Sequence, residues 1–120
     1  MNAARTEMGT STATTDRRRD ARYEFIAEAE IIDVASGTAV TARTVDLSRG
    51  GCYIDIFSPL PEKTVVTLRL TKWQQTLKAR AQVAYSSMGM GMGLMFDVLD
   101  PMDRATLESW LTQVRATQAC

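Results

Sequence analysis

The central part of the sequence alternates between apolar and polar residues, and this period of two limits the possible folds more than any other feature. The alternation is clearest over residues 76–85, where five apolar side chains occupy one parity. Successive side chains of a β-strand point to opposite faces, whereas a helix needs apolar residues three or four positions apart. The segment is therefore predicted to be a strand with one buried face. Its apolar positions are Leu77, Ala79, Ala81, Val83 and Tyr85.

Five further segments between about residues 23 and 98 are typical of strands. The first two, residues 23–31 and 38–45, flank the turn signal Ser36-Gly37, so we expect them to pair antiparallel. The third ends before Pro59, because proline cannot donate a ladder hydrogen bond. Six short strands joined by tight turns predict a closed barrel or a sandwich. The other predicted inward residues are Tyr23, Phe25, Ala27, Ala29 and Ile31; Cys52, Ile54 and Ile56; Val66, Leu68 and Leu70; and Met90, Met92, Leu94, Phe96 and Val98.

The period changes to that of a helix after Asp100. This aspartate is suited to cap a helix, and Pro101 fits the first helical position. We expect an amphipathic helix over about residues 101–116 that packs on the strands, with docking to a partner as the alternative. Its apolar residues at helical spacing are Leu107, Trp110, Leu111 and Val114.

The length of 120 residues allows one compact domain and a tail. Residues 1–15 are small and polar without periodicity, so we expect a disordered tail there and a single domain over residues 16–117. No apolar run approaches the ~20 residues that a membrane span needs, and the N-terminus has no hydrophobic signal core. These features predict a cytoplasmic protein that does not insert into a membrane.

The absence of histidine from the sequence excludes most catalytic and metal-binding sites. It removes the commonest general base and every Ser-His or Cys-His nucleophile pair. Two cysteines are too few for a zinc site without histidine. Cys52 is expected in the core, and Cys120 ends the chain, where it can crosslink dimers on oxidation. No catalytic residue, metal or cofactor is therefore predicted, and we do not expect an enzyme.

Two other clusters of residues have a chemical and a structural explanation. Methionines can bind soft metals, but their spacing here favours core filling. Three aspartates could supply the paired carboxylates of an enzyme, yet a strand end and a helix start explain them more simply. The residues are Met88, Met90, Met92 and Met95, and Asp97, Asp100 and Asp103.

A short arginine-rich segment is the first of two stretches outside the hydrophobic pattern. Fourteen basic and fourteen acidic residues leave the chain without net charge, which argues against a nucleic acid polymer as partner. Residues 17–22 nevertheless contain four arginines and one aspartate, a local net charge of +3. Guanidinium groups bind phosphates and the O6/N7 edge of guanine, and they stack on bases. This segment favours a compact ligand with phosphates and purines.

The second stretch is Asp46-Leu47-Ser48-Arg49-Gly50-Gly51, between the second and third predicted strands. An ionised Asp accepts hydrogen bonds from the N1–H and exocyclic amine of guanine, and a Ser hydroxyl donates or accepts. Gly50 and Gly51 leave room for a ligand to approach the backbone. A turn with positive φ is the alternative for the glycines, and an Asx-type turn is the alternative for Asp46 and Ser48.

In this order and at these strand boundaries, the two stretches resemble the motifs of the PilZ domain family. Arg18-Arg19-Asp20-Ala21-Arg22 matches the family's RxxxR, and the second stretch matches its DxSxxG. The later Gly91-Met92-Gly93-Leu94-Met95-Phe96 is similar to the family's glycine-containing strand. The resemblance covers about residues 16–115. It implies a six-stranded antiparallel β-barrel with a C-terminal helix that binds the bacterial second messenger cyclic di-GMP.

The resemblance also implies a role for each matching residue. Arg18 and Arg22 would grip a guanine edge, stack on a base and neutralise phosphate, while Asp46 and Ser48 hold the polar edge of guanine. Arg17 matches the family subset with RRxxxR, which is associated with a stacked pair of ligand molecules. The expected ligand-binding residues are Arg17, Arg18, Arg22, Asp46, Ser48, Gly50 and Gly51.

The leading hypothesis is a non-enzymatic cyclic di-GMP receptor whose arginine segment becomes ordered when ligand binds. The ordered segment would dock on a downstream partner such as flagellar, secretion or polysaccharide-synthesis machinery. One alternative is an adaptor that keeps the barrel without binding nucleotide. The other is a small-barrel RNA-binding protein, which needs exposed aromatic side chains, whereas most of the eight aromatics here fall on predicted apolar faces.

Overall fold

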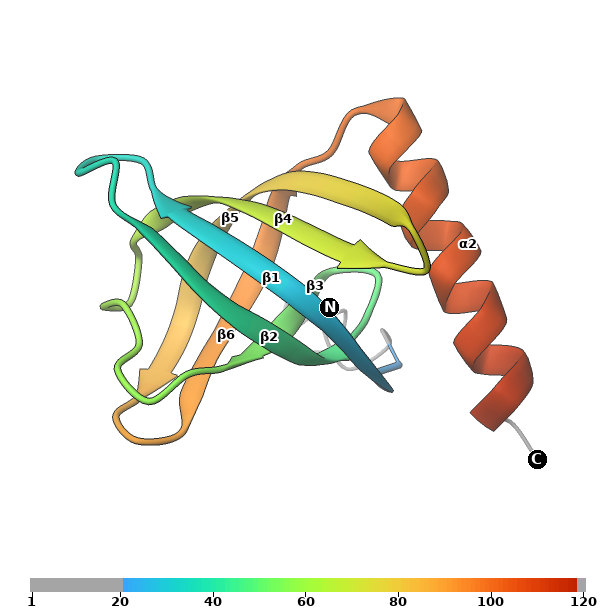
Figure 1. The fold of residues 1–120 in the computed structure, drawn as a ribbon, viewed down its shortest axis with the longest axis horizontal. Helices are drawn as coiled ribbons and strands as arrows, with labels where there is room; N and C mark the ends of the chain where they lie inside the picture. Colours follow the sequence, from blue (N-terminus) through green and yellow to red (C-terminus); the bar gives the residue numbers. More distant parts are fainter. Residues whose placement is uncertain (1–20, 119–120) are drawn as a thin grey trace, which may run out of the picture.

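Six antiparallel strands close into a barrel in the computed structural model, which describes residues 21–118, and one helix packs against it (Figure 1). The strand order around the barrel is β1-β2-β3-β6-β5-β4. The prediction of a closed barrel with a C-terminal helix is confirmed. The elements are β1 (Tyr23–Asp33), β2 (Ala39–Leu47), β3 (Gly51–Asp55), β4 (Val65–Lys72), β5 (Gln75–Ser87), β6 (Gly91–Val98) and α2 (Pro101–Gln118).

The barrel interior follows the alternation of the sequence. In β1 every second residue from Phe25 to Ile31 is buried, and β4 shows the same pattern from Val66 to Leu70. β1 pairs antiparallel with β2 around the Ser36-Gly37 turn, as predicted. Cys52 is buried in this core, and burial raises the pKa of its thiol from 9.0 to about 12. In β1 and β4 the residues that the alternation predicted to face inward are therefore the ones that are buried.

Three residues predicted to face inward are exposed instead. Tyr85, Met90 and Val98 have exposed fractions of 43%, 64% and 59%. Ala84 is an extra residue in β5, because Val83 pairs with Leu94 while Tyr85 pairs with Gly93. Asp97 is likewise an extra residue in β6, so the parity of each strand reverses beyond these points. Met90 lies in the turn before β6, and of the four clustered methionines only Met92 is buried.

The aromatic side chains are also more exposed than their positions in the sequence predicted. Only Phe25 and Trp110 are fully buried, whereas Phe57, Trp73 and Tyr85 are exposed and the other three are half-buried. Phe57 and Trp73 lie in turns between strands. The expectation that most aromatics belong to the core is therefore wrong.

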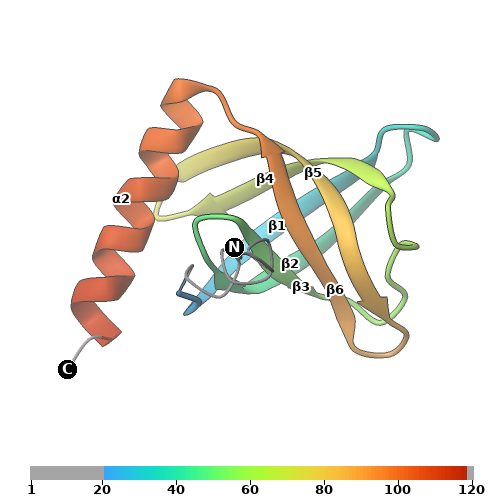
Figure 2. The same ribbon diagram turned by 180° about the vertical axis from the view of Figure 1, so that it is seen from behind.

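Helix α2 covers the end of the barrel where β1 begins and where β4 turns into β5 (Figures 1 and 2). Asp100 caps it by accepting a hydrogen bond from the Asp103 amide at 3.0 Å, and this bond lowers the pKa of Asp100. Trp110 lies 5.1 Å from the Phe25 ring and donates a hydrogen bond to the Gln75 side chain at 3.0 Å. The apolar face of the helix thus packs against the barrel, as predicted, and is not free to bind a partner. Its buried residues are Leu107, Trp110, Leu111 and Val114.

Two structural features are absent from residues 21–118. Over that range no helix is long and apolar enough to cross a membrane. Nor do the same residues contain a group of three His, Cys, Asp or Glu side chains placed to hold a metal ion. The expected tail, the arginines before Arg22 and Cys120 lie outside the described residues.

Candidate functional site

The DxSxxG stretch is divided between two strands and a short loop. Asp46 and Leu47 are the last residues of β2, and Gly51 is the first residue of β3. The prediction that the whole stretch lies outside the hydrophobic pattern is wrong, because Leu47 is fully buried in the core. Only residues 48–50 form the loop.

An extra residue in β2 places Asp46 on the outside of the barrel. Thr44 pairs with Ile54, but Asp46 pairs with Tyr53, so Val45 is a β-bulge against β3. Thr44 and Leu47 both face the core, which strict alternation does not allow three residues apart. The bulge therefore moves the Asp46 carboxylate from the inner to the outer face without opening the core.

Thr44 links the two strands at this bulge. It is fully buried, and its hydroxyl lies 2.9 Å from the carbonyl oxygen of Asp46 and 2.8 Å from that of Tyr53. A hydroxyl has one hydrogen, so it donates to one of these carbonyls at a time. Sequence reasoning missed Thr44, because a single β-branched residue in a strand carries no signal of a bulge.

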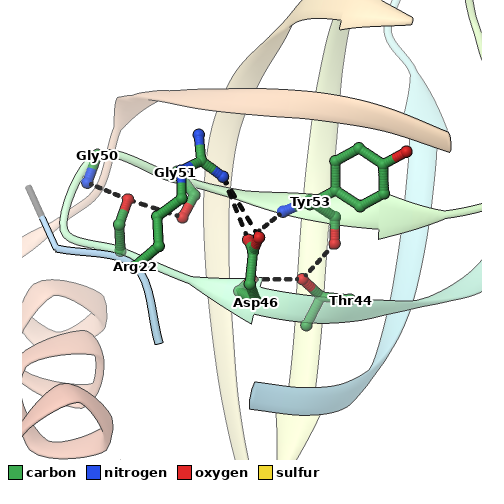
Figure 3. A network of polar contacts seen from close by, with 7 residues as sticks. Arg22, Thr44, Asp46, Gly50, Gly51 and Tyr53 are labelled. Carbon is green, nitrogen blue, oxygen red and sulfur yellow. Dashed lines mark hydrogen bonds and ion pairs between the residues drawn. The ribbon is translucent and has the colours of Figure 1, made fainter. Parts of the chain in front are cut away.

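The Asp46 carboxylate joins the two motifs (Figure 3). Its Oδ1 accepts a hydrogen bond from the Tyr53 amide at 3.0 Å, and both of its oxygens lie 3.4 Å from Nη1 of Arg22. The Arg22 and Asp46 side chains are 49% and 29% exposed. An exposed ion pair at this distance contributes less than about 1 kcal/mol. It is therefore easily rearranged, while the amide bond holds the carboxylate in place.

Ser48 is turned toward its own loop. It is buried, its hydroxyl accepts from the Gly50 amide and donates to the Gly51 carbonyl, each at 3.3 Å, and its amide donates to the same carbonyl at 2.9 Å. The Ser48 side chain therefore stabilises the turn, which is the role given above as the alternative to ligand binding.

Gly51 serves close packing, and neither Gly50 nor Gly51 serves a turn with positive φ. Neither has a positive φ angle. A Cβ at Gly51 would collide with the carbonyl of Leu94, and the Gly50 carbonyl accepts a hydrogen bond from the Phe96 amide at 2.8 Å. The loop is therefore held tightly against β6, and the turn explanation with positive φ is wrong.

The other arginines of the two stretches do not pair with Asp46 among the described residues. Nε of Arg49 lies 3.3 Å from the carboxylate of Glu108 on α2, so Arg49 pairs with the helix and not with Asp46. Arg17, Arg18 and Arg19 lie outside the described residues. Of the predicted ligand-binding residues, the structure brings Arg22 and Asp46 together, and it places Ser48 and Gly50 in the adjoining loop and Gly51 at the start of β3.

Two tyrosines lie on the outer face near Asp46: Tyr53 pairs directly with Asp46, and Tyr85 lies two strands beyond Tyr53. The rings of Tyr53 and Tyr85 are 6.2 Å apart between centroids and tilted by 31°. Partial burial raises the pKa of Tyr53, with smaller contributions from Tyr85 and two aspartates. Neither tyrosine was a predicted site residue: Tyr53 was on the polar side of a strand and Tyr85 was predicted to be inside. Tyr85 was predicted to be inside because the alternation of the sequence does not reveal the extra residue Ala84.

A comparison with protein families identifies the chain. The model of the PilZ domain family matches residues 16–113. The chain belongs to the PilZ domain family. The match includes the arginine segment, the DxSxxG stretch and α2 up to residue 113.

Solved structures show the same fold in other PilZ domains. The PilZ domain of CeSA from a cellulose-synthesizing bacterium has a TM-score of 0.64 and 18% identity, covering 79% of this chain and 98% of that one. YcgR from Escherichia coli in complex with c-di-GMP has a TM-score of 0.70 and 18% identity over 84% of this chain and 47% of that one. The Bacillus subtilis inhibitor of motility MotI has a TM-score of 0.69 and 14% identity over 85% and 52%.

This PilZ domain spans about half the length of the YcgR and MotI chains. No curated protein is significantly similar to it in sequence. At these identities the structures establish the fold, and the function has to be argued from the site.

Proposed function

We propose that this PilZ domain is a cytoplasmic, non-enzymatic receptor for cyclic di-GMP. The observation that carries the proposal is the pairing of Arg22 with Asp46 on the outer face, which joins two motifs 24 residues apart in the chain. Two structures of YcgR that share its fold contain c-di-GMP. The rest of the proposal follows from the chemistry of these side chains.

The Arg22–Asp46 pair offers complementary groups to a guanine. A carboxylate accepts from the N1–H and exocyclic amine, while a guanidinium donates to O6 and N7 or to a phosphate oxygen. Because Asp46 is held by the Tyr53 amide, its free oxygen lone pairs keep one orientation toward solvent. Arg22 is half-exposed and can exchange its weak ion pair for a ligand.

The other predicted residues supply charge and shape. Arg17 and Arg18 would add cations beside Arg22, which a dianionic ligand requires. The loop after β2 would act by fixing the position of the end of β2. The Ser48 hydroxyl is bonded within this loop, together with Gly50 and Gly51, and would not contact the ligand itself. We therefore propose Ser48 as a positioning residue of the site.

The residues after Arg22 offer a route by which binding reaches a partner. The Tyr23 ring lies 5.9 Å from the guanidinium of Arg115, and the Glu24 carbonyl accepts a hydrogen bond from the Gln118 side chain at 2.8 Å. Both contacts are made by the end of α2. Ordering of the arginine segment would thus change a surface shared with α2. A flagellar, secretion or polysaccharide-synthesis protein is the kind of partner that would bind to this surface.

Isothermal titration with cyclic di-GMP tests the proposal. The wild type should bind saturably, and Arg18→Ala and Arg22→Ala should each weaken binding by about tenfold or more, because each removes charge-assisted hydrogen bonds. Arg69→Ala is the matched control, since Arg69 is an exposed arginine whose 3.8 Å ion pair with Glu30 lies on β1 and β4. It should bind like the wild type.

The same titration distinguishes the alternatives. A wild type that does not bind cyclic di-GMP would support the adaptor, and unchanged binding in both arginine variants would disprove the proposed site. Competition by RNA that weakens steeply with salt would favour the RNA-binding alternative. The stoichiometry tests Arg17: two ligands per chain in the wild type and one in Arg17→Ala is the expected result.

A further inference from the structure

Tyr53, Gly93 and Tyr85 lie at one level across three neighbouring strands. Tyr53 of β3 and Tyr85 of β5 each pair with Gly93 of β6, which runs between them. We call the surface formed by Tyr53, Tyr85, Gly91 and Gly93 the tyrosine face. The two rings are 6.2 Å apart between centroids and tilted by 31° to each other. Together they cover the part of β6 that carries no side chain.

The two glycines of β6 make room for these rings. A Cβ at Gly93 would collide with the Tyr85 ring, and a Cβ at Gly91 would lie 2.7 Å from the Tyr53 hydroxyl oxygen. The rings therefore lie over the strand instead of standing away from it. Tyr85 is 43% exposed, so part of its side chain is accessible to a ligand. The tyrosine face is therefore aromatic and partly open.

Two independent irregularities bring the tyrosine face next to Asp46. The extra residue Val45 turns Asp46 outward, and the extra residue Ala84 turns Tyr85 outward. Without the second one Tyr85 would point into the barrel, as its parity in the sequence predicts. The Tyr53 amide donates its hydrogen bond to Asp46 at 3.0 Å, so the carboxylate is fixed at the border of the aromatic surface.

We infer that the tyrosine face is a stacking platform for a purine base whose polar edge is read by Asp46 and Arg22. This inference rests on the proposed receptor function and extends it from the motif residues to Tyr53 and Tyr85. A planar base presents a hydrogen-bonding edge and a π face at right angles to each other. The carboxylate of Asp46 can accept hydrogen bonds from the edge, and the tyrosine rings can stack on the π face. Phosphate alone gains nothing from an aromatic surface, so the platform selects ligands that carry a base.

Variants of Tyr85 test the platform by isothermal titration with cyclic di-GMP. Tyr85→Phe keeps the ring and should bind within about twofold of the wild type. Tyr85→Leu and Tyr85→Ala lose the π surface and should weaken binding by about tenfold, the usual effect of removing one stacking partner. Phe57→Ala is the control, because Phe57 is an exposed aromatic in the loop between β3 and β4. It should leave the affinity unchanged.

A second readout separates stacking from a change in the fold. A base that stacks on tyrosine should show an upfield shift of its H8 proton resonance on binding, and Tyr85→Leu should remove that shift while leaving the thermal unfolding of the protein nearly unchanged. Wild-type affinity in Tyr85→Ala, or a loss in Tyr85→Phe equal to that in Tyr85→Leu, would overturn the platform and leave the receptor standing. A wild type that binds no cyclic di-GMP would overturn the receptor itself.

Discussion

The barrel interior and the outer face beside Asp46 are built from the same strands in opposite ways. Inside, β1 and β4 bury every second residue without interruption over the segments that face the core. Outside, Asp46 and Tyr85 occupy their positions because one extra residue interrupts the alternation of β2 and another that of β5. Alternating burial along β1 and β4 fills the core, even though β1 has a register shift against β2 between Glu24 and Ala27. The β-bulges in β2 and β5, in contrast, re-aim single side chains. The proposed site therefore belongs to the irregular part of the barrel.

The two regions should respond differently to mutation, and Trp110 gives the largest effect. Trp110 is fully buried against Phe25. Trp110→Ala should lower the free energy of unfolding by about 3–5 kcal/mol in urea denaturation, because it leaves a large cavity. The half-exposed Trp73 is the control, and Trp73→Ala should cost less. A small loss in Trp110→Ala would mean that α2 does not depend on this contact.

Alkaline pH should weaken the interior through Cys52. Its thiol has a pKa of about 12 in the folded protein and 9.0 as a reference, so the folded state keeps a proton that the unfolded chain loses above pH 9. The free energy of unfolding should be unaffected below pH 9 and should fall by about 1.4 kcal/mol for each pH unit above it, toward pH 12. Urea unfolding at pH 8, 9 and 10 measures this in Cys120→Ser. The same slope in Cys52→Ala/Cys120→Ser would contradict it.

The bulge beside Asp46 should couple stability to binding. Thr44→Val keeps the shape of the buried side chain but removes the hydroxyl that donates to the Asp46 or the Tyr53 carbonyl. We expect a loss of about 1–2 kcal/mol in unfolding free energy and a several-fold weaker affinity for cyclic di-GMP. Thr67→Val, on β4, should change stability by less than about 0.5 kcal/mol and leave binding unchanged. If Thr44→Val loses stability alone, the bulge does not position Asp46.

The smallest effect is expected where the motif loop meets α2. The Arg49 and Glu108 side chains are 57% and 42% exposed, so solvent screens their ion pair. A double-mutant cycle of Arg49→Gln and Glu108→Gln, measured by urea denaturation, should give a coupling below about 0.5 kcal/mol. A coupling above about 1 kcal/mol would show that the helix and the motif loop form one unit.

The sequence predicted the fold well because burial repeats along each strand. In β1 and β4 the alternation alone identified the core, and Asp100 with Pro101 marked the start of α2. The family resemblance located the two motifs of the proposed site, and the structure joins Arg22 to Asp46. A single residue in the sequence does not indicate a β-bulge, so Thr44, Tyr53 and the outward orientation of Tyr85 were not predicted. Their roles depend on which residue pairs across the strands, and the sequence does not show this.

A nuclear magnetic resonance titration of the ¹⁵N-labelled protein with cyclic di-GMP tests the central claim most directly. Ligand bound at the irregular outer face should shift the backbone amide signals there and leave those of β4 in place. The amides expected to shift are Arg22, Asp46, Gly51, Tyr53 and Tyr85. Shifts centred on Thr67 and Arg69 instead, or no shift at saturating ligand, would contradict the account.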